Sequence, residues 1–281
     1  MTLPAAAVIG LLHPGEMGSA VGQCLARAGH TVLWASGGRG PQTASRARAA
    51  GLTDAGTIGE LAGRAEVIMS ICPPHAALDV ARAVRGFSGR YVDANAISPA
   101  TARQVATIVV GGGADYTDGG IVGPPPLKPG STRLYLSGSN AGAIAGLFDD
   151  TPLDAKIVTG SPWAASSLKM AYAAWTKGSA ALLLAIRALA DREDVAAALL
   201  AEWQLSQPGL EDRSIQAARS AQGKGWRWVA EMQEIAGTMA AAGLPSGFHQ
   251  AAAEIYRGRP DRPTTDWARN GDQQPASRSE R

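Results

Sequence analysis

The stretch IGLLHPGEMGSAVG, residues 9–22, comes close to the pattern G-x-G-x-x-G that joins a strand to a helix in a βαβ unit. The second and third glycines are present as Gly15 and Gly18, while His13 stands at the place of the first and Pro14 follows it. Proline fixes its own φ and disfavours the helical region for the residue before it. We therefore expect His13-Pro14 to give this turn a rigid, extended approach.

The segments on either side fit a βαβ unit. Residues 5–12 form an apolar run typical of a buried parallel strand, residues 16–28 have helical spacing, and residues 31–34 predict the next strand. In such units the second glycine lets the backbone approach a pyrophosphate, and the third lets the helix pack on the strand. The turn therefore predicts dinucleotide binding by His13, Pro14, Gly15, Glu16, Met17 and Gly18. The alternative is a glycine-rich turn of another kind of α/β protein.

The end of the second strand indicates which dinucleotide would bind. Enzymes that use NAD usually place Asp or Glu there, whereas WASGGRGPQTASRAR (34–48) contains neither. Ser36 and Arg39 would suit a 2′-phosphate, because a guanidinium forks onto phosphate oxygens. We predict NADP (NADPH) rather than NAD. The alternative is a solvated basic loop, with Arg46 and Arg48 on the surface of a helix.

The alternation of strands and helices continues to about residue 160. Strands are expected at 66–72, 89–93, 116–122, 133–137 and 155–158, and helices at 75–84, 99–109 and 140–148. The predicted fold class is α/β, a Rossmann-type doubly wound parallel sheet, as an NADP-binding domain over residues 1–160.

The pattern then becomes all-helical. Ser161 and Pro162 predict the start of a long helix that ends near Leu189, and further helices are expected at 194–205, 211–221 and 226–242. We predict a helical domain for the substrate and for dimerisation over residues 161–256, and a flexible tail over residues 257–281. Helices rich in alanine and leucine on more than one face need additional burial, which predicts a homodimer.

Composition limits the partners and the compartment. The net charge of +2 gives no reason to expect nucleic acid or acidic membranes. Two cysteines make no disulfide framework, and the N-terminus lacks the basic segment of a signal peptide, so a cytoplasmic location is expected. No His, Cys and Asp spacing suits a metal. A small-molecule substrate is the expected partner.

Several motifs in order resemble the β-hydroxyacid dehydrogenases, which are relatives of 6-phosphogluconate dehydrogenase and of imine reductases. They are GLLHPGEMG (10–18), ICPP (71–74), VDANAISPATA (92–102), DGGIVGPPP (118–126) and SSLKMAYAAWTKG (166–178). The resemblance implies a dimer whose active site lies between the domains, with Lys169 as the catalytic lysine. Lys177, two turns further along near the same face of the helix, is a lesser candidate. It implies further cofactor contacts at Cys72, Pro73 and Asn95, and substrate contacts at Ser98, Val122, Gly123 and Tyr172.

The residues around Lys169 fit this role. Leu168, Met170 and Ala171 make its helix apolar, which favours a buried functional lysine over a solvated charge. In a dry cleft beside a positively charged nicotinamide ring, the pKa of a lysine falls, so it can exchange a proton near neutral pH.

The departures from the family pattern concern the substrate. The family's loop reads D-x-P-V-S-G-G, and here Val122 replaces its serine and Pro124 its last glycine. Ala173 replaces an asparagine, and Asn95-Ala96 replace a Ser-Thr pair. Because anchors for a carboxylate are lost, we expect a more apolar pocket, with aromatic residues such as Tyr172 in its wall.

The expected function is an NADPH-dependent oxidoreductase that transfers hydride to or from a carbonyl or hydroxyl carbon, with Lys169 as general acid/base. One alternative is C=N reduction of the imine reductase kind, and another is a dinucleotide-binding protein without catalysis.

Overall fold

The computed structural model describes residue 4 and residues 6–258, without the side chain of Lys224. The expected tail therefore lies outside the described residues, apart from Arg257, which ends a helix, and Gly258. The chain divides into two compact units, Met1–Ala171 and Tyr172–Arg281. Each is described by itself.

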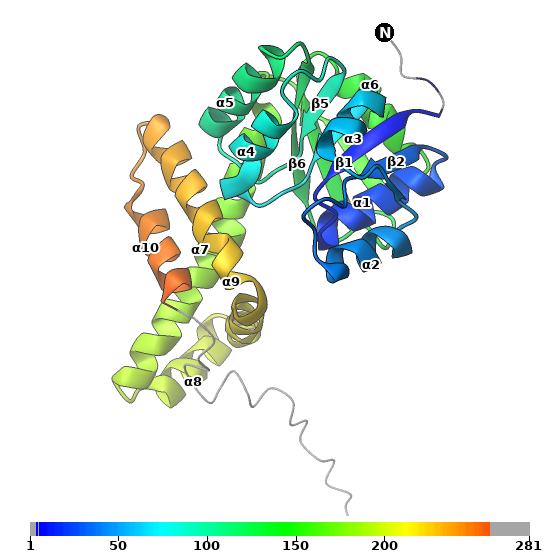
Figure 1. The fold of residues 1–281 in the computed structure, drawn as a ribbon. Helices are drawn as coiled ribbons and strands as arrows, with labels where there is room; N and C mark the ends of the chain where they lie inside the picture. Colours follow the sequence, from blue (N-terminus) through cyan, green and yellow to red (C-terminus); the bar gives the residue numbers. More distant parts are fainter. Residues whose placement is uncertain (1–3, 5, 259–281) are drawn as a thin grey trace, which may run out of the picture. The chain divides into compact units, whose positions relative to one another are not determined.

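The first unit is built on one eight-stranded sheet in the order β3-β2-β1-β4-β5-β6-β7-β8 (Figure 1). Neighbouring strands are parallel except β6 and β7, so the carboxyl ends of the first six strands share one edge. The order reverses on either side of β1, and this reversal is where α/β sheets bind ligands. The strands are β1 Val8–Leu12, β2 Thr31–Trp34, β3 Thr53–Asp54, β4 Val67–Ser70, β5 Arg90–Asp93, β6 Asp115–Val122, β7 Thr132–Ser137 and β8 Leu153–Ile157.

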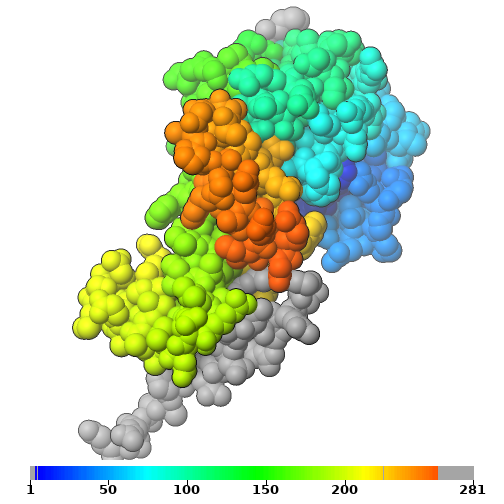
Figure 2. All heavy atoms as spheres, turned by 90° about the vertical axis from the view of Figure 1, so that its left-hand side faces the viewer, coloured from blue at the N-terminus to red at the C-terminus, as the bar shows by residue number. Residues whose placement is uncertain are grey.

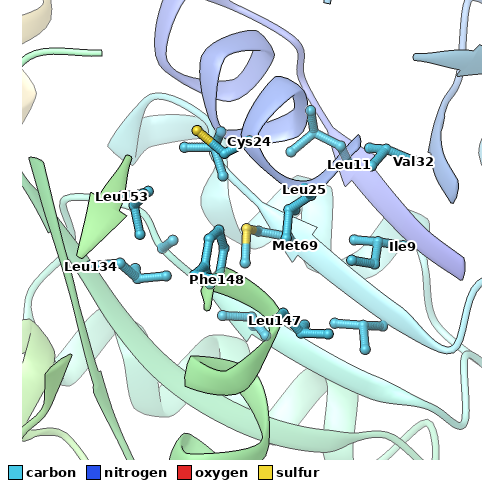
Figure 3. Close-up of a cluster of buried hydrophobic side chains, with 14 of the residues drawn as sticks. Ile9, Leu11, Cys24, Leu25, Val32, Met69, Leu134, Leu147, Phe148 and Leu153 are labelled. Carbon is cyan, nitrogen blue, oxygen red and sulfur yellow. The ribbon is translucent and has the colours of Figure 1, made fainter. Parts of the chain in front are cut away.

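Helices cover both faces of this sheet. Ile9 and Leu11 of β1 belong to one hydrophobic core, which they form with side chains of α1 and η2. Leu12 belongs to a second core, which is formed with α3, α4 and α5. Figure 3 shows the first core, in which Leu25 and Phe148 meet the strands. Burial on both faces explains why the central strands β1 and β4 are nearly continuous apolar runs. The helices are α1 Glu16–Arg27, α2 Pro41–Ala49, α3 Ile58–Arg64, η1 Pro74–Ala76, α4 Ala77–Ala83, α5 Pro99–Val110, α6 Ala141–Ala145 and η2 Gly146–Phe148.

The long helix α7, Ala164–Arg192, begins in the first unit and continues in the second. It starts three residues after the predicted Ser161, whose hydroxyl accepts the backbone N–H of Trp163 instead of capping the α-helix itself. The second unit also contains α8 Ala196–Ser206, α9 Leu210–Ala241 and α10 Gly247–Arg257. Figure 2 shows α10, in orange, along the surface of this helical unit.

The prediction of two helices at 211–221 and 226–242 is wrong, since α9 runs without a break. Gly223 and Gly225 lie between the two predicted helices, and each glycine costs a helix about 1 kcal/mol relative to alanine. Packing outweighs that cost: Tyr256 of α10 lies against Gly225 and meets the Trp228 ring edge-on at 5.1 Å. The sequence patterns also left β3, α3 and α10 unpredicted. No helix among the described residues is long and apolar enough to cross a membrane.

Candidate active site

The glycine-rich turn connects β1 to α1. The N–H of Gly15 donates to the carbonyl oxygen of His13 at 2.8 Å, so the chain reverses around Pro14. His13 has φ 69°, in the left-handed region that few residues other than glycine adopt. The predicted extended approach is therefore wrong. The turn needs the backbone of a glycine at this position, and the histidine adopts it despite its side chain.

Gly15 and Gly18, the two retained glycines of the turn, are explained by different physical reasons. A Cβ on Gly18 would strike the carbonyl oxygen of His13, so this glycine lets α1 pack on the turn. Gly15 precedes α1 with φ −71°, and a Cβ there would meet nothing within 4 Å. Neither its backbone nor its neighbours require a glycine. A small residue at a helix N-terminus without a side-chain cap leaves room for a phosphate to approach the backbone N–H groups.

Two arginines reach the same turn. The guanidinium of Arg39 donates to Nε2 of His13 at 2.8 Å, and that of Arg46 contacts the carbonyl oxygen of Pro14 at 3.5 Å. Burial, and secondly the charge of Arg39, lower the pKa of His13 to about 4. His13 is thus neutral at physiological pH. Arg46 is half-buried and contacts the turn, whereas Arg48 on the same helix is exposed.

A carboxylate lies beside the loop after β2, although none occurs in that segment of the sequence. Asp54 ends β3 and pairs in register with Trp34, the last residue of β2. Its Oδ1 accepts the N–H of Gly56 at 2.8 Å. This hydrogen bond is the main cause that lowers the pKa of Asp54. The pairing of β2 with β3 was not predicted, so this neighbour of Ser36 was missed.

Cys72, Pro73 and Asn95 lie where β4 and β5 end. The buried side chain of Asn95 accepts the N–H of Cys72 at 2.6 Å and donates to Ser70 Oγ at 3.1 Å, which ties the two strand ends together. Burial, followed by the charge of Asp93, raises the pKa of the Cys72 thiol to about 12. The thiol is therefore protonated at neutral pH. Pro73 precedes the short helix η1.

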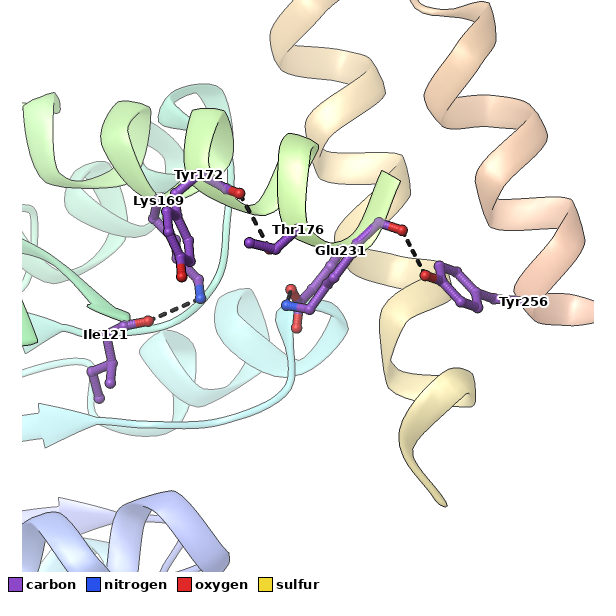
Figure 4. A network of polar contacts seen from close by, with 7 residues as sticks. Ile121, Lys169, Tyr172, Thr176, Glu231 and Tyr256 are labelled. Carbon is purple, nitrogen blue, oxygen red and sulfur yellow. Dashed lines mark hydrogen bonds and ion pairs between the residues drawn. The ribbon is translucent and has the colours of Figure 1, made fainter. Parts of the chain in front are cut away.

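Lys169 lies at the end of β6 on the first turns of α7. Its Nζ donates to the carbonyl oxygen of Ile121 at 2.9 Å (Figure 4). Gly120 permits this packing, because a Cβ there would lie 2.9 Å from Lys169 Cβ and 3.1 Å from the carbonyl oxygen of Ala165. Since β1 and β6 are parallel members of one sheet, Lys169 and the glycine-rich turn share its carboxyl-end edge.

Asp118 of β6 fixes the start of α7. Its buried carboxylate accepts the N–H of Ser166 at 2.8 Å and the hydroxyl of Ser137 at 3.0 Å, and also the hydroxyl of Ser166. Burial raises the pKa of Asp118, and these hydrogen bonds oppose that shift. The loop motif had been associated with substrate alone, so this supporting role was missed.

The expected substrate residues differ in their surroundings. Ser98 is a buried N-cap of α5 that accepts the N–H of Thr101 at 3.1 Å. Val122 is buried at the end of β6, and Gly123 has φ 119° with the carbonyl oxygen of Ser131 where its Cβ would be. The positive φ and the lack of space for a Cβ both require glycine at position 123, so the turn itself explains this residue.

Tyr172 and Lys177 belong to the second unit. Tyr172 follows Lys169 by one turn of α7 and is 46% exposed. Lys177 forms a largely buried ion pair with Glu231, while the hydroxyl of Tyr256 donates to the Lys177 carbonyl oxygen at 2.6 Å (Figure 4). This pairing gives Lys177 a structural partner inside the helical unit. No group of His, Cys, Asp and Glu that could hold a metal occurs among the described residues.

Comparison by sequence gives one family model and a curated relative. The model describes a domain of unknown function (DUF1932) and matches residues 190–258. The relative is an uncharacterized 28.5 kDa protein from Methanothermus fervidus, 26% identical over 156 residues, which are 55% of this chain and 60% of that protein.

Comparison with solved structures finds similar folds over most of the chain. A conserved protein of unknown function, similar in structure to 3-hydroxyacid dehydrogenases, is 25% identical with a TM-score of 0.66 over 89% of this chain and 96% of its own. A 3-hydroxyisobutyrate dehydrogenase from Salmonella typhimurium is 18% identical, with a TM-score of 0.68 over 90% and 93%. A reductive aminase from Aspergillus terreus in complex with NADPH and ethyl levulinate is 19% identical, with a TM-score of 0.56 over 90% and 93%.

Proposed function

Because the chain shares the fold of the 3-hydroxyisobutyrate dehydrogenases and imine reductases, as its motifs predicted, we propose that it is an NADPH-dependent oxidoreductase. It transfers hydride to or from a carbonyl or hydroxyl carbon of a small organic substrate. The observation that carries this proposal is the position of Lys169, which is held by Ile121 on the sheet edge that also carries the glycine-rich turn.

The residues present fit a dinucleotide phosphate. Gly15 leaves the N-terminus of α1 open, and Arg39 and Arg46 both contact the His13-Pro14 turn. A helix N-terminus and guanidinium groups bind phosphate through N–H donors and positive charge. His13 is neutral and holds Arg39, so it orients a phosphate-binding group without contributing a charge of its own.

Lys169 acts as the general acid in reduction and as the general base in oxidation. When bound, NADPH would supply the hydride in reduction, and NADP⁺ would accept it in oxidation. Lys169 Nζ gives a proton to the carbonyl oxygen in reduction, so that C=O becomes CH–OH, and takes it from the hydroxyl in oxidation. Its hydrogen bond to the Ile121 carbonyl oxygen orients the ammonium at the end of β6.

The surroundings of Lys169 favour a substrate without a carboxylate. Val122 brings a buried methyl-bearing side chain where the family's loop has a serine, and Pro124 has no N–H to donate. A small 3-hydroxy acid would lose at least two hydrogen-bond donors here. We therefore expect aldehydes or ketones without an acid group to be turned over faster than keto acids.

The lost carboxylate anchors also favour a second candidate, reduction of a C=N bond. Imine reductases share the fold, with a TM-score of 0.55 for the enzyme from Pseudomonas sp.. An iminium substrate arrives already protonated, so it would need little from Lys169. The retained lysine is the reason to place carbonyl chemistry first.

We also propose that the protein is a homodimer. The helical unit exposes large apolar side chains, among them Trp175, which is 69% exposed, and Leu189, which is 59% exposed. Exposed apolar groups of this size on an all-helical unit are typical of a surface that a second copy covers.

A substrate panel tests the proposed activity. The purified chain is incubated with NADPH and, separately, with aldehydes, ketones, keto acids and cyclic imines, and the loss of NADPH absorbance is followed. Turnover of carbonyl compounds above imines supports the first candidate, and the reverse order supports the second. Tight NADPH binding with no turnover of any class would contradict both and leave a dinucleotide-binding protein.

A further inference from the structure

Strand β6 and the start of helix α7 contact each other in register. Alternate residues of β6 lie on the same face of the sheet, and their partners follow one another at intervals of three residues. The pairs are Tyr116 with Trp163, Asp118 with Ser166, and Gly120 with Lys169. Because residues three apart are neighbours on a helix surface, the contact at Trp163 is the first of a row that leads to Lys169.

The indole of Trp163 is held from two sides. Its ring centroid lies 5.6 Å from that of Tyr116, with an angle of 45° between the planes, and Tyr116 is stacked on Tyr91 of β5 at 6.4 Å. The guanidinium carbon of Arg103, on α5, lies 5.6 Å from the centre of the Trp163 ring. Aromatic pairs and a cation over an indole each favour particular geometries. The half-buried indole is therefore fixed between β6 and α5 against the second hydrophobic core.

The backbone of Trp163 is part of the same attachment. Its carbonyl oxygen accepts the N–H of Ser167 at 3.0 Å and the hydroxyl of Ser167 at 2.9 Å, so a shift of Trp163 moves the first turn of α7. Lys169 follows Trp163 by six residues, which is about 9 Å along the axis of a helix. A slide or tilt of the first turn therefore changes where Nζ of Lys169 lies.

We propose that Trp163 is a positioning residue, which sets the place of Lys169 on β6 through the stack of Tyr116, Trp163 and Arg103. The inference rests on the proposed function, in which Lys169 transfers the proton. Asp118 holds backbone and hydroxyl groups of the same turn, whereas the stack opposes sliding of α7 along β6. A slide would pull a large ring away from the second core, where it is partly buried.

The first test separates catalysis from binding. Trp163→Ala removes the ring, while Trp163→Phe keeps an aromatic ring beside Tyr116. On the best carbonyl substrate we expect kcat to fall about 10–100-fold in Trp163→Ala, the scale of a misplaced catalytic group, and to be largely restored in Trp163→Phe. The dissociation constant for NADPH should stay within about twofold of wild type in both, because the glycine-rich turn belongs to β1 and α1.

The second test needs no turnover. Each folded protein is treated briefly with acetic anhydride, and peptide mass spectrometry gives the acetylation rate of Lys169 relative to the half-exposed Lys156. Loss of the stack should free Nζ of Lys169 from the carbonyl oxygen of Ile121. We expect the rate ratio to rise about threefold or more in Trp163→Ala, and Trp163→Phe should bring it back.

Phe87→Leu is the matched control. It truncates a buried ring of the same second core in the loop before β5, at the amino edge of the sheet. This variant should be less stable in urea denaturation, but its kcat and its acetylation ratio should equal those of wild type. Arg103→Ala removes only the exposed guanidinium of the stack, so it serves where Trp163→Ala does not fold, and its ratio should rise about twofold or more.

The inference is overturned by a kcat or an acetylation ratio that stays within about twofold of wild type in folded Trp163→Ala. An unchanged ratio in Arg103→Ala, or a fall of kcat in Phe87→Leu as large as that in Trp163→Ala, would overturn it as well. Wild-type protein that turns over no substrate would instead contradict the proposed function. The acetylation ratios would then still decide whether Trp163 holds Lys169 in place.

Discussion

The backbone N–H of Ser166 donates to the buried carboxylate of Asp118 at 2.8 Å, and this contact ties the first turn of α7 to the middle of β6. Lys169 follows Ser166 by three residues, so the same contact sets where the lysine projects. The close approach at Gly120 and the bond from Lys169 to the Ile121 carbonyl oxygen continue the attachment along β6. The candidate catalytic lysine is thus positioned by three successive parts of one strand.

Replacement of Asp118 should weaken both stability and activity. Asp118→Asn keeps the shape but sets an amide N–H against the Ser166 or Ser137 donors, which leaves a buried donor unpaired. We expect a loss of about 1–3 kcal/mol in the free energy of unfolding, measured by urea denaturation. Asp115→Asn, on the same strand but exposed, should lose almost nothing. Equal stability of the two variants would show that Asp118 does not hold α7.

The local parts of the fold are readable from the sequence, and the non-local parts are not. The β1-α1-β2 unit was predicted because its apolar runs, glycines and helix signals all lie within neighbouring residues. The short strand β3 carries no apolar run, and only its pairing with β2 makes it a strand. The continuity of α9 likewise depends on α10, through Tyr256 packed on Gly225.

In the candidate site, too, the local features were predicted from the sequence and the non-local contacts were not. Lys169 was predicted from its motif, and its Nζ donates to the carbonyl oxygen of Ile121 at the end of β6. The contact between Ser166 and Asp118 that holds this part of α7 joins residues 48 positions apart, so no local sequence pattern predicts it. The left-handed backbone of His13 is a case where the turn overrides what the residue and its following proline prefer. Its partner Arg39 was predicted as a phosphate ligand, while the bond between the two was not.

The buried state of His13 should make stability depend on pH. Its pKa is about 4 in the folded chain and 6.5 ordinarily, so between these values the unfolded chain binds more protons. The stabilising effect is complete above pH 6.5 and is lost as the pH falls toward 4. The ring is only partly buried, so we expect an effect on the order of 1 kcal/mol after solvent screening.

His13→Asn isolates this effect, because asparagine tolerates the left-handed backbone and does not titrate in this range. Urea denaturation of both proteins at several pH values gives the difference in unfolding free energy. The difference should shrink as the pH falls from 6.5 to 4. A difference that stays constant across that window would mean that His13 titrates normally in the folded chain.

Arg39 should be the main determinant of NADPH affinity. Arg39→Ala removes a guanidinium that a 2′-phosphate would use, and we expect NADPH binding to weaken by about 1–3 kcal/mol while NADH binding hardly changes. Titration with each dinucleotide measures this. Arg48→Ala, at an exposed position of α2, is the control with the same change of charge. Wild-type protein that prefers NADH would contradict the assignment of this loop to NADP.

The exposed apolar side chains of the helical unit predict a homodimer in which α7 packs across the two-fold axis. Sedimentation equilibrium at micromolar concentration should give twice the chain mass. Trp175→Glu, at a 69% exposed position of α7, should shift the protein toward monomer without unfolding it. A wild-type chain that sediments as an active monomer would rule this assembly out.

The central claim, that Lys169 performs the proton transfer of a hydride-transfer reaction, is tested most directly by kcat in Lys169→Ala, measured beside the dissociation constant for NADPH. The control is Lys156→Ala, a half-exposed lysine paired with Asp154 on β8. On carbonyl substrates we predict a fall in kcat of about 10²–10⁴-fold, with NADPH affinity unchanged and a basic limb lost from the pH profile. A large loss on carbonyls beside a small one on cyclic imines would favour C=N reduction instead. A variant that folds by circular dichroism and keeps the kcat of the control on every substrate would contradict the claim.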